Sequence, residues 1–251
     1  MSSAFRTNGE PLHFATLWEA IADEIPSAPA LTHGARTVAW GEFEQRAARL
    51  AGALRAHGLG PGSVVACYLY NCPEYFETFL AALKIRAVPA NVNYRYGGAE
   101  LRALLENCEA EALFFDSALR ERVASVRHDL PWIRLLVEVG EAAPAAPLPG
   151  ACGYEKLISS SAPAPRVSRS EQDVFLSYTG GTTGLPKGVR YTIAAVWRTP
   201  LGCANCSSAR APSSGSWSTR PSRHATAIAW SPSRRRRSCT APGLFSPRSP
   251  R

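Results

Sequence analysis

The sequence of 251 residues lacks the features that would assign it to a membrane or secreted class. It has no run of about 18 consecutive apolar residues, so no membrane-spanning helix is expected. Its first residues contain no basic stretch followed by an apolar core, so no secretory signal is expected. The seven cysteines follow no regular spacing. Without an export signal, we expect them to be reduced thiols of a cytoplasmic protein.

The last part of the chain, residues 192–251, contains no lysine, aspartate or glutamate. It holds ten of the 28 basic side chains, all of them arginine, which leaves 18 basic and 20 acidic side chains in residues 1–191. The formal charge of +8 therefore comes from this tail alone, and a basic surface over the whole protein is excluded. Serine, arginine, alanine and proline fill 38 of the tail's 60 positions, and no apolar periodicity continues past Val196.

Two interpretations of the tail compete. The first is a disordered basic arm that binds nucleic acid through Arg234–Arg237. The second is translation in a shifted reading frame, which in GC-rich DNA yields arginine, serine, proline and alanine. Disordered segments are poor in aromatic residues, whereas this tail contains three tryptophans and three cysteines. We therefore favour the shifted frame, and expect residues 192–251 to be disordered and to have no specific nucleic-acid partner.

Four residues of the tail could in principle bind zinc. Cys203, Cys206, His224 and Cys239 supply suitable ligand atoms, but their spacing fits no common zinc module. We therefore predict no metal site in this sequence.

Residues 1–191 alternate short apolar runs with segments of helical periodicity. Phe43, Leu50 and Leu54 recur at helical spacing, and Gly58 follows as the end of that helix. Strands that are apolar on both faces and alternate with helices are typical of a parallel sheet covered on both sides. The predicted class is therefore α/β, a mostly parallel sheet flanked by helices. The expected strands are 64–69, 87–92, 112–115 and 133–139, and the expected helices lie around 43–54, 73–83, 101–105 and 119–126.

The same pattern predicts the apolar face of one helix and the positions of two linkers. The helix that begins near Pro73 has an expected apolar face made of four residues, Phe76, Phe79, Leu80 and Leu83. The segments 140–151 and 159–170 are rich in proline, alanine, glycine or serine, and they are expected to be surface linkers within one domain.

A segment rich in glycine and threonine, Leu176–Gly188, directly follows an apolar run. Glycines let backbone N–H groups turn toward an anion, threonine hydroxyls add donors, and lysine adds a positive charge. This is the chemistry of a loop that holds nucleotide phosphates. It is not a Walker A loop, because Pro186 precedes Lys187 and Gly188 follows it. The predicted phosphate-binding residues are Thr179, Gly180, Gly181, Thr182, Thr183, Gly184 and Lys187; the alternative is a glycine-rich hairpin turn without a ligand.

Position by position, Leu176–Lys187 resembles the AMP-binding signature of the adenylate-forming enzymes, which include acyl-CoA synthetases, luciferases and peptide-synthetase adenylation domains. Thr37–Phe43 and Ala82–Pro89 also resemble segments of that family, although Arg86 stands where glycine is usual. Asn91–Tyr96 is most similar to the fatty-acid and steroid-acid CoA ligases of actinobacteria. The resemblance runs from about residue 17 to residue 191. It implies that residues 1–191 are a partial AMP-binding domain, the N-terminal part of the family's large domain.

The resemblance also implies an activity, that of an AMP-forming acid–CoA ligase. Such an enzyme joins the carboxylate of a fatty or steroid acid to the α-phosphate of ATP and releases pyrophosphate, after which the thiol of CoA displaces AMP. The implied cofactors and substrates are ATP, Mg²⁺, CoA and the acid. In this scheme Thr179, Thr182 and Thr183 donate hydroxyl groups to the phosphates, the glycines permit close approach, and Lys187 neutralises the departing pyrophosphate.

Several segments of the family have no counterpart in this sequence. They include the acyl pocket, the glutamate that binds magnesium and the lysine used in adenylation, and a tail without carboxylate or lysine cannot replace them. We therefore expect a truncated ligase with no catalytic residue of its own, no metal ligand and at most weak binding of ATP or phosphate. The alternative within the class is an acyl-AMP ligase that transfers its product to a carrier protein.

Overall fold

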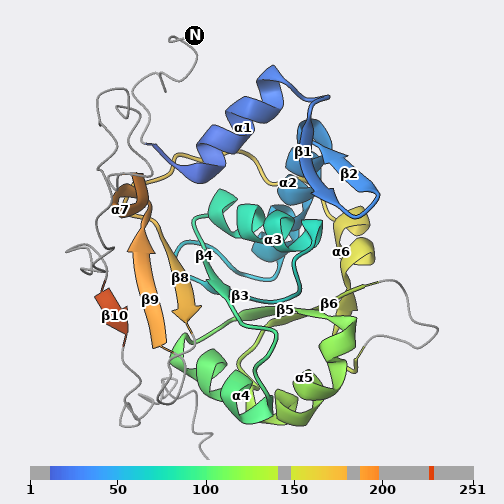
Figure 1. Ribbon diagram of the computed structural model, residues 1–251, viewed down its shortest axis with the longest axis vertical. Helices are drawn as coiled ribbons and strands as arrows, with labels where there is room; N and C mark the ends of the chain where they lie inside the picture. The colour runs from blue at the N-terminus through green and yellow to red at the C-terminus, as the bar shows by residue number, and fades with distance from the viewer. Residues whose placement is uncertain (1–11, 141–147, 180–186, 198–225, 229–251) are drawn as a thin grey trace, which may run out of the picture.

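The computed structural model describes residues 12–140, 148–179, 187–197 and 226–228, which form a twisted sheet with helices on both faces (Figure 1). The strand order is β10-β9-β8-β4-β3-β5-β6-β7. Strands β8 to β7 in that order run parallel, while β9 and β10 run antiparallel to their neighbours. The predicted α/β class with a mostly parallel sheet is therefore confirmed. The bounds are β3 Val64–Tyr68, β4 Val88–Asn91, β5 Ala112–Asp116, β6 Leu135–Val139, β7 Cys152–Gly153, β8 Val174–Thr179, β9 Lys187–Thr192 and β10 Thr226–Ile228.

The central strands are buried on both faces because their side chains alternate between two apolar cores. On β5, Leu113 and Phe115 pack toward α4 (Gly98–Asn107) and α5 (Arg120–Val126). Phe114 of the same strand packs toward α2 (Trp40–Ala56) and α6 (Tyr154–Ser160) on the opposite face. Figure 1 shows α4 and α5 on one side of the sheet and α2 and α3 on the other. This double cover explains the continuous apolar runs in the sequence.

Helix α3 (Pro73–Lys84) corrects one expectation about its apolar face. It begins with Pro73, as predicted, but Phe76 is 43% exposed whereas Glu77 is completely buried. The helix is turned so that Glu77 receives hydrogen bonds from Arg46 Nε (2.8 Å) and from the Tyr154 hydroxyl (2.7 Å). A buried carboxylate is tolerated when such donors satisfy it. The exposed position of Phe76 follows from that rotation.

The N-terminal part and one long connection cover the outside of α2 and α3. Helix α1 (Phe14–Glu24) and the hairpin of β1 (Pro29–His33) and β2 (Arg36–Ala39) precede α2. The connection 161–173 contains neither helix nor strand and leads from α6 to β8. It lies so close to α2 that a Cβ atom at Gly52 would be 1.9 Å from the Ala162 carbonyl oxygen. Most of 159–170 is at the surface, as expected, but Arg169 is buried.

Regular structure continues for a few residues past position 191. Strand β9 ends at Thr192, and α7 (Ile193–Trp197) follows with Ile193, Ala194 and Ala195 buried. Strand β10 pairs with β9, with Ile228 opposite Gly188. The rest of 198–251 lies outside the described residues, so the domain boundary at 191, the disorder of the tail and its shifted frame stay predictions.

Candidate functional site

The predicted glycine-rich loop, residues 179–187, joins β8 to β9. The antiparallel register of these strands places Thr179 opposite Lys187 and Tyr178 opposite Gly188. Two of the seven predicted phosphate-binding residues, Thr179 and Lys187, are thus adjacent at the two ends of the loop, and the Lys187 side chain is exposed. The other five, Gly180, Gly181, Thr182, Thr183 and Gly184, lie outside the described residues. Their role as phosphate ligands stays a prediction.

The loop follows the carboxyl end of the parallel strands. Strand β8 runs parallel to β4, with Ala90 opposite Leu176, so β8 ends, at Thr179, at the same end of the sheet as β4 and β3. In open α/β sheets, ligands bind beyond the carboxyl ends of the strands, where the strand order reverses. The order reverses here around β3, because β4 lies on one side of it and β5 on the other. The topology therefore places Thr179 and Lys187, which flank the loop, at the end of the sheet where a ligand is expected.

The same carboxyl end carries two exposed tyrosines that sequence reasoning did not identify as a pair. The ring centroids of Tyr70 and Tyr94 are 4.8 Å apart, and the side chains are 39% and 37% exposed. The Arg95 guanidinium lies 5.7 Å from the Tyr94 ring. Arg122 donates a hydrogen bond of 2.7 Å to the Tyr94 carbonyl oxygen and so ties this segment to α5. The only signal in the sequence was that Tyr70 lies shortly after the apolar run of β3 and Tyr94 shortly after that of β4.

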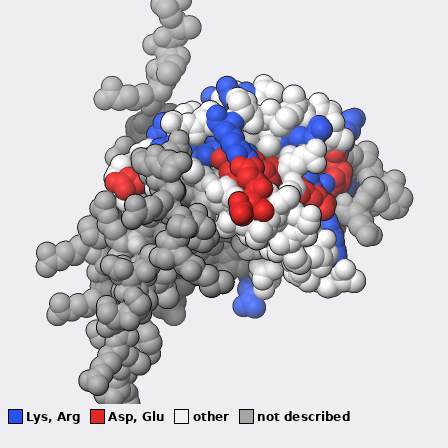
Figure 2. Space-filling view, turned by 90° about the horizontal axis from the view of Figure 1, so that it is seen from above, with Lys and Arg blue, Asp and Glu red and all other residues white. Residues whose placement is uncertain are grey.

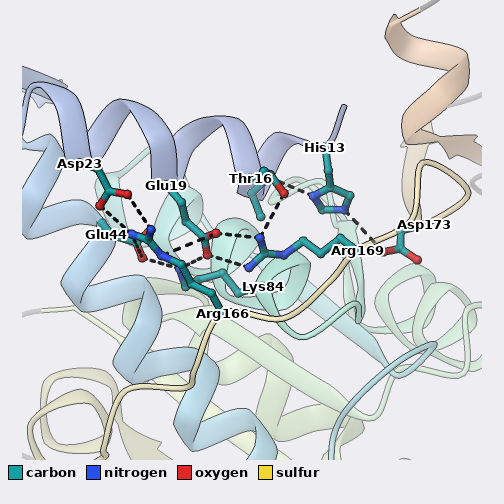
Figure 3. A network of polar contacts seen from close by, with 10 residues as sticks. His13, Thr16, Glu19, Asp23, Glu44, Lys84, Arg166, Arg169 and Asp173 are labelled. Carbon is teal, nitrogen blue, oxygen red and sulfur yellow. Dashed lines mark hydrogen bonds and ion pairs between the residues drawn. The ribbon is translucent and has the colours of Figure 1, made fainter. Parts of the chain in front are cut away.

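At the opposite, amino end of the parallel strands lies a network of buried charges (Figure 3). Lys84, at the end of α3, donates to Glu19 of α1 and to Glu44 of α2, each at 2.5 Å. Arg169 of the connection donates two hydrogen bonds of 2.7 Å to the same Glu19. Burial by itself would raise the pKa of Glu19, but the hydrogen bonds from Arg169 and Lys84 outweigh it and hold that pKa below its ordinary value. Glu19 is therefore a charged anchor between α1, α3 and the connection.

Two further pairs extend this network along α1. Arg166 binds Asp23 with hydrogen bonds of 2.6 and 2.8 Å. His13 begins α1 by accepting the Ala15 N–H at its Nδ1, and its Nε2 lies 3.6 Å from an Asp173 oxygen. Figure 2 shows basic and acidic side chains side by side on the face seen from above in Figure 1. Since these charges are matched within the protein, we assign this network to fastening α1 and the connection rather than to ligand binding.

The backbone conformation of Arg86 is one that glycine adopts more easily than other residues. Arg86 adopts a φ of +62°, in the left-handed region that disfavours side chains other than glycine. Its side chain forms a forked ion pair with Asp173, with Nε–Oδ2 at 3.0 Å and Nη2–Oδ1 at 2.9 Å. Asp173 directly precedes β8, so this pair ties the turn before β4 to the start of β8.

The described residues contain no group of three or more histidine, cysteine or acidic side chains that could hold a metal ion. None of their helices is long and apolar enough to cross a membrane. Their four cysteines, Cys67, Cys72, Cys108 and Cys152, are free. The potential zinc ligands Cys203, Cys206, His224 and Cys239 lie outside the described residues.

Comparisons with known proteins agree with this architecture. The model of the AMP-binding enzyme family matches residues 18–232. The 3-oxocholest-4-en-26-oate–CoA ligase of Rhodococcus rhodochrous is 37% identical over 189 residues, which cover 74% of this chain and 34% of that protein. The medium-chain acyl-CoA ligase Mig of Mycobacterium avium is 34% identical over 201 residues, covering 74% and 36%.

Solved structures show the same likeness in three dimensions. Acetoacetyl-CoA synthetase from Streptomyces lividans has a TM-score of 0.67 at 27% identity. The matched region covers 74% of this chain and 31% of that one. A benzoate CoA ligase from Burkholderia xenovorans has a TM-score of 0.64 at 26% identity, covering 77% and 38%. The chain thus spans about a third of the length of the curated relatives it matches. It belongs to the AMP-binding enzyme family, and the two curated relatives described above are CoA ligases.

Proposed function

We propose that this chain is the N-terminal part of the large domain of an AMP-forming acid–CoA ligase, and that its own contribution to the reaction is the glycine-rich loop. The observation that supports this most strongly is the β8–β9 register, which brings Lys187 and Thr179 together at the carboxyl end of the parallel sheet. An exposed lysine at the end of a loop with three glycines is suited to a polyphosphate. Family membership makes ATP the natural source of that polyphosphate.

In the proposed reaction, ATP supplies the adenylyl group that activates a carboxylate, and CoA accepts the acyl group. The loop N–H groups and threonine hydroxyls would hold the phosphates, and Lys187 would offset the charge that develops on the leaving pyrophosphate. A fatty or steroid acid is the proposed substrate class, since the curated relatives from Rhodococcus rhodochrous and Mycobacterium avium are named for a steroid acid and for medium-chain acyl groups. Among the described residues we assign no ligand for Mg²⁺.

We further propose that residues 1–251 alone do not synthesise acyl-CoA. Enzymes lower reaction barriers by about 8–23 kcal/mol, whereas a charge-assisted hydrogen bond contributes only about 1.5–3 kcal/mol. A few contacts from the loop can hold an anion, but they cannot also orient a carboxylate against the α-phosphate. Turnover in an assay of pyrophosphate release with ATP, Mg²⁺ and fatty or steroid acids, if abolished by Lys187→Ala, would contradict this.

Binding is tested by calorimetric titration of tripolyphosphate and ATP into the full chain and into Lys187→Ala. We expect the substitution to weaken binding about 10- to 100-fold, from the loss of one charge-assisted hydrogen bond. Lys156→Ala is the matched control, because Lys156 is an exposed lysine on α6, far along the sheet order from the loop. Equal affinities for the two variants, or no binding by the unmodified chain, would refute the proposed role of the loop.

A further inference from the structure

Tyr178 lies on β8, directly before the glycine-rich loop, and contacts β9, which follows the loop. It immediately precedes Thr179, where the loop begins, and it pairs with Gly188, which immediately follows Lys187. Its side chain is only 3% exposed and points into the core formed with α4. The hydroxyl donates a hydrogen bond of 2.6 Å to Oδ1 of Asn107, the last residue of α4. Tyr178 is therefore fixed at its tip as well as at its backbone.

The backbone of Tyr178 is held by the side chain of Asn91. The β4–β8 pairing ends with Asn91 opposite Ser177. One residue farther on, the Tyr178 N–H donates to Oδ1 of Asn91 at 2.6 Å. The asparagine side chain thus continues the contact between the two strands past their last backbone pair. It fixes β8 to β4 directly before the loop begins.

The Tyr178 ring also determines the residue on the other strand. A Cβ atom at Gly188 would lie 2.7 Å from Cζ of Tyr178 and 3.0 Å from its Cε1 and hydroxyl oxygen. The ring therefore rests directly against the Gly188 backbone, at a separation that no other residue permits. This packing explains the glycine after Lys187.

We propose that Tyr178, through Asn91, Asn107 and Gly188, is a positioning residue that holds Thr179 and Lys187 in place for an anionic ligand. The inference rests on the proposed function of the loop and assigns its supporting residues. A loop whose ends are fixed in advance loses less conformational entropy when it binds, and its N–H groups need less reorganisation. None of these four residues touches the ligand in this scheme.

The test compares two substitutions that each remove one buried phenol hydroxyl. Tyr178→Phe removes the bond to Asn107. Tyr154→Phe removes the 2.7 Å bond from Tyr154 to Glu77, and Tyr154 is also 3% exposed but packs on the other face of the sheet. Tyr154→Phe should lose at least as much thermal stability as Tyr178→Phe, because the Tyr154 hydroxyl donates to a carboxyl group and the Tyr178 hydroxyl to an amide. We expect only Tyr178→Phe to weaken tripolyphosphate binding, about 3- to 10-fold, and to speed amide hydrogen exchange at Thr179 and Lys187 in the unliganded chain.

A second variant, Asn91→Ala, removes the other attachment and should speed exchange at Thr179 in the same way. If Tyr178→Phe and Tyr154→Phe have equal affinities and equal exchange at Thr179 and Lys187, the positioning role is refuted. If the unmodified chain binds no tripolyphosphate, the proposed function fails instead. In that case the exchange measurement still decides whether Tyr178 holds the ends of the loop.

Discussion

Two groups of charged side chains, one at each end of the parallel strands, differ in whether they have partners. At the amino end, Lys84 and Arg169 are buried against Glu19, and every one of these charges has a partner at hydrogen-bond distance. At the carboxyl end, Lys187 and Arg95 are exposed, and within the described part of the chain neither forms an ion pair. Paired charges in the interior hold elements together, whereas an unpaired exposed cation remains free for an anion. We therefore expect changes at the amino end to alter stability and changes at the carboxyl end to alter binding.

Glu19→Ala should have the largest effect on stability. It leaves Arg169 without its carboxylate and Lys84 with only Glu44, and breaking a buried ion pair in this way typically destabilises a protein by about 3–5 kcal/mol. Urea denaturation measures the change, with Glu24→Ala as the control because Glu24 is exposed at the end of the same helix. The folded fraction of the variant should bind tripolyphosphate as before. A large fall in affinity for tripolyphosphate would contradict the expectation that changes at the amino end alter stability and not binding.

Acid should weaken the amino end through His13. Burial, with a smaller contribution from Arg169, lowers the pKa of His13 from 6.5 to about 4. The unfolded chain therefore takes up this proton first as the pH falls. The stabilising contribution is present in full above pH 6.5 and is lost between pH 6.5 and 4, with a total of about 3 kcal/mol.

His13→Asn isolates this contribution. Asparagine can still accept a hydrogen bond at the start of α1, but it does not titrate. Unfolding measured at a series of pH values should show a flatter dependence for the variant between pH 4 and 6.5 than for the unmodified chain. If the stabilities of the two proteins depend on pH in the same way, His13 does not contribute to the loss of stability in acid.

Arg86 offers a smaller and more specific test. Both Arg86→Gly and Arg86→Ala remove the ion pair with Asp173, but only glycine relieves the φ of +62°. The glycine variant should therefore be more stable than the alanine variant by about 1 kcal/mol. The difference in thermal midpoint measures this directly. Equal stabilities would mean that the left-handed backbone at this position carries little strain.

The sequence predicted best those elements whose signal is local and repetitive. The spacing of Phe43, Leu50 and Leu54 predicted α2, and the apolar run at Val64 predicted β3, because each depends only on neighbours along the chain. The apolar run Val174–Leu176 was likewise visible in the sequence, and it forms the first part of β8. The outer helix α1 was not predicted, because its buried face includes Glu19, which no apolar pattern could reveal.

Residues that act through distant partners could not be identified. Glu77 is buried because Arg46 and Tyr154 satisfy it, and those residues come from helices far apart in the sequence. Tyr178 was recognised only as part of a motif, since its link to Asn107 needs the packing of α4 against β8. The tyrosine pair at Tyr70 and Tyr94 likewise needs β3 and β4 to be neighbours in the sheet. In each case the missing information is which elements lie side by side.

The long connection 161–173 also bears on how the chain folds. The pairings among β3 to β7 join residues nearer in sequence than the β4–β8 pairing does, and the connection must pass over α2 before Leu176 can pair with Ala90. Closing so long a loop costs entropy before any pairing repays it, and such contacts slow folding. We therefore expect the β8–β9 hairpin to join the sheet last. The end of the molecule proposed to bind phosphate would then be assembled only after the rest of the sheet provides the surface that receives it.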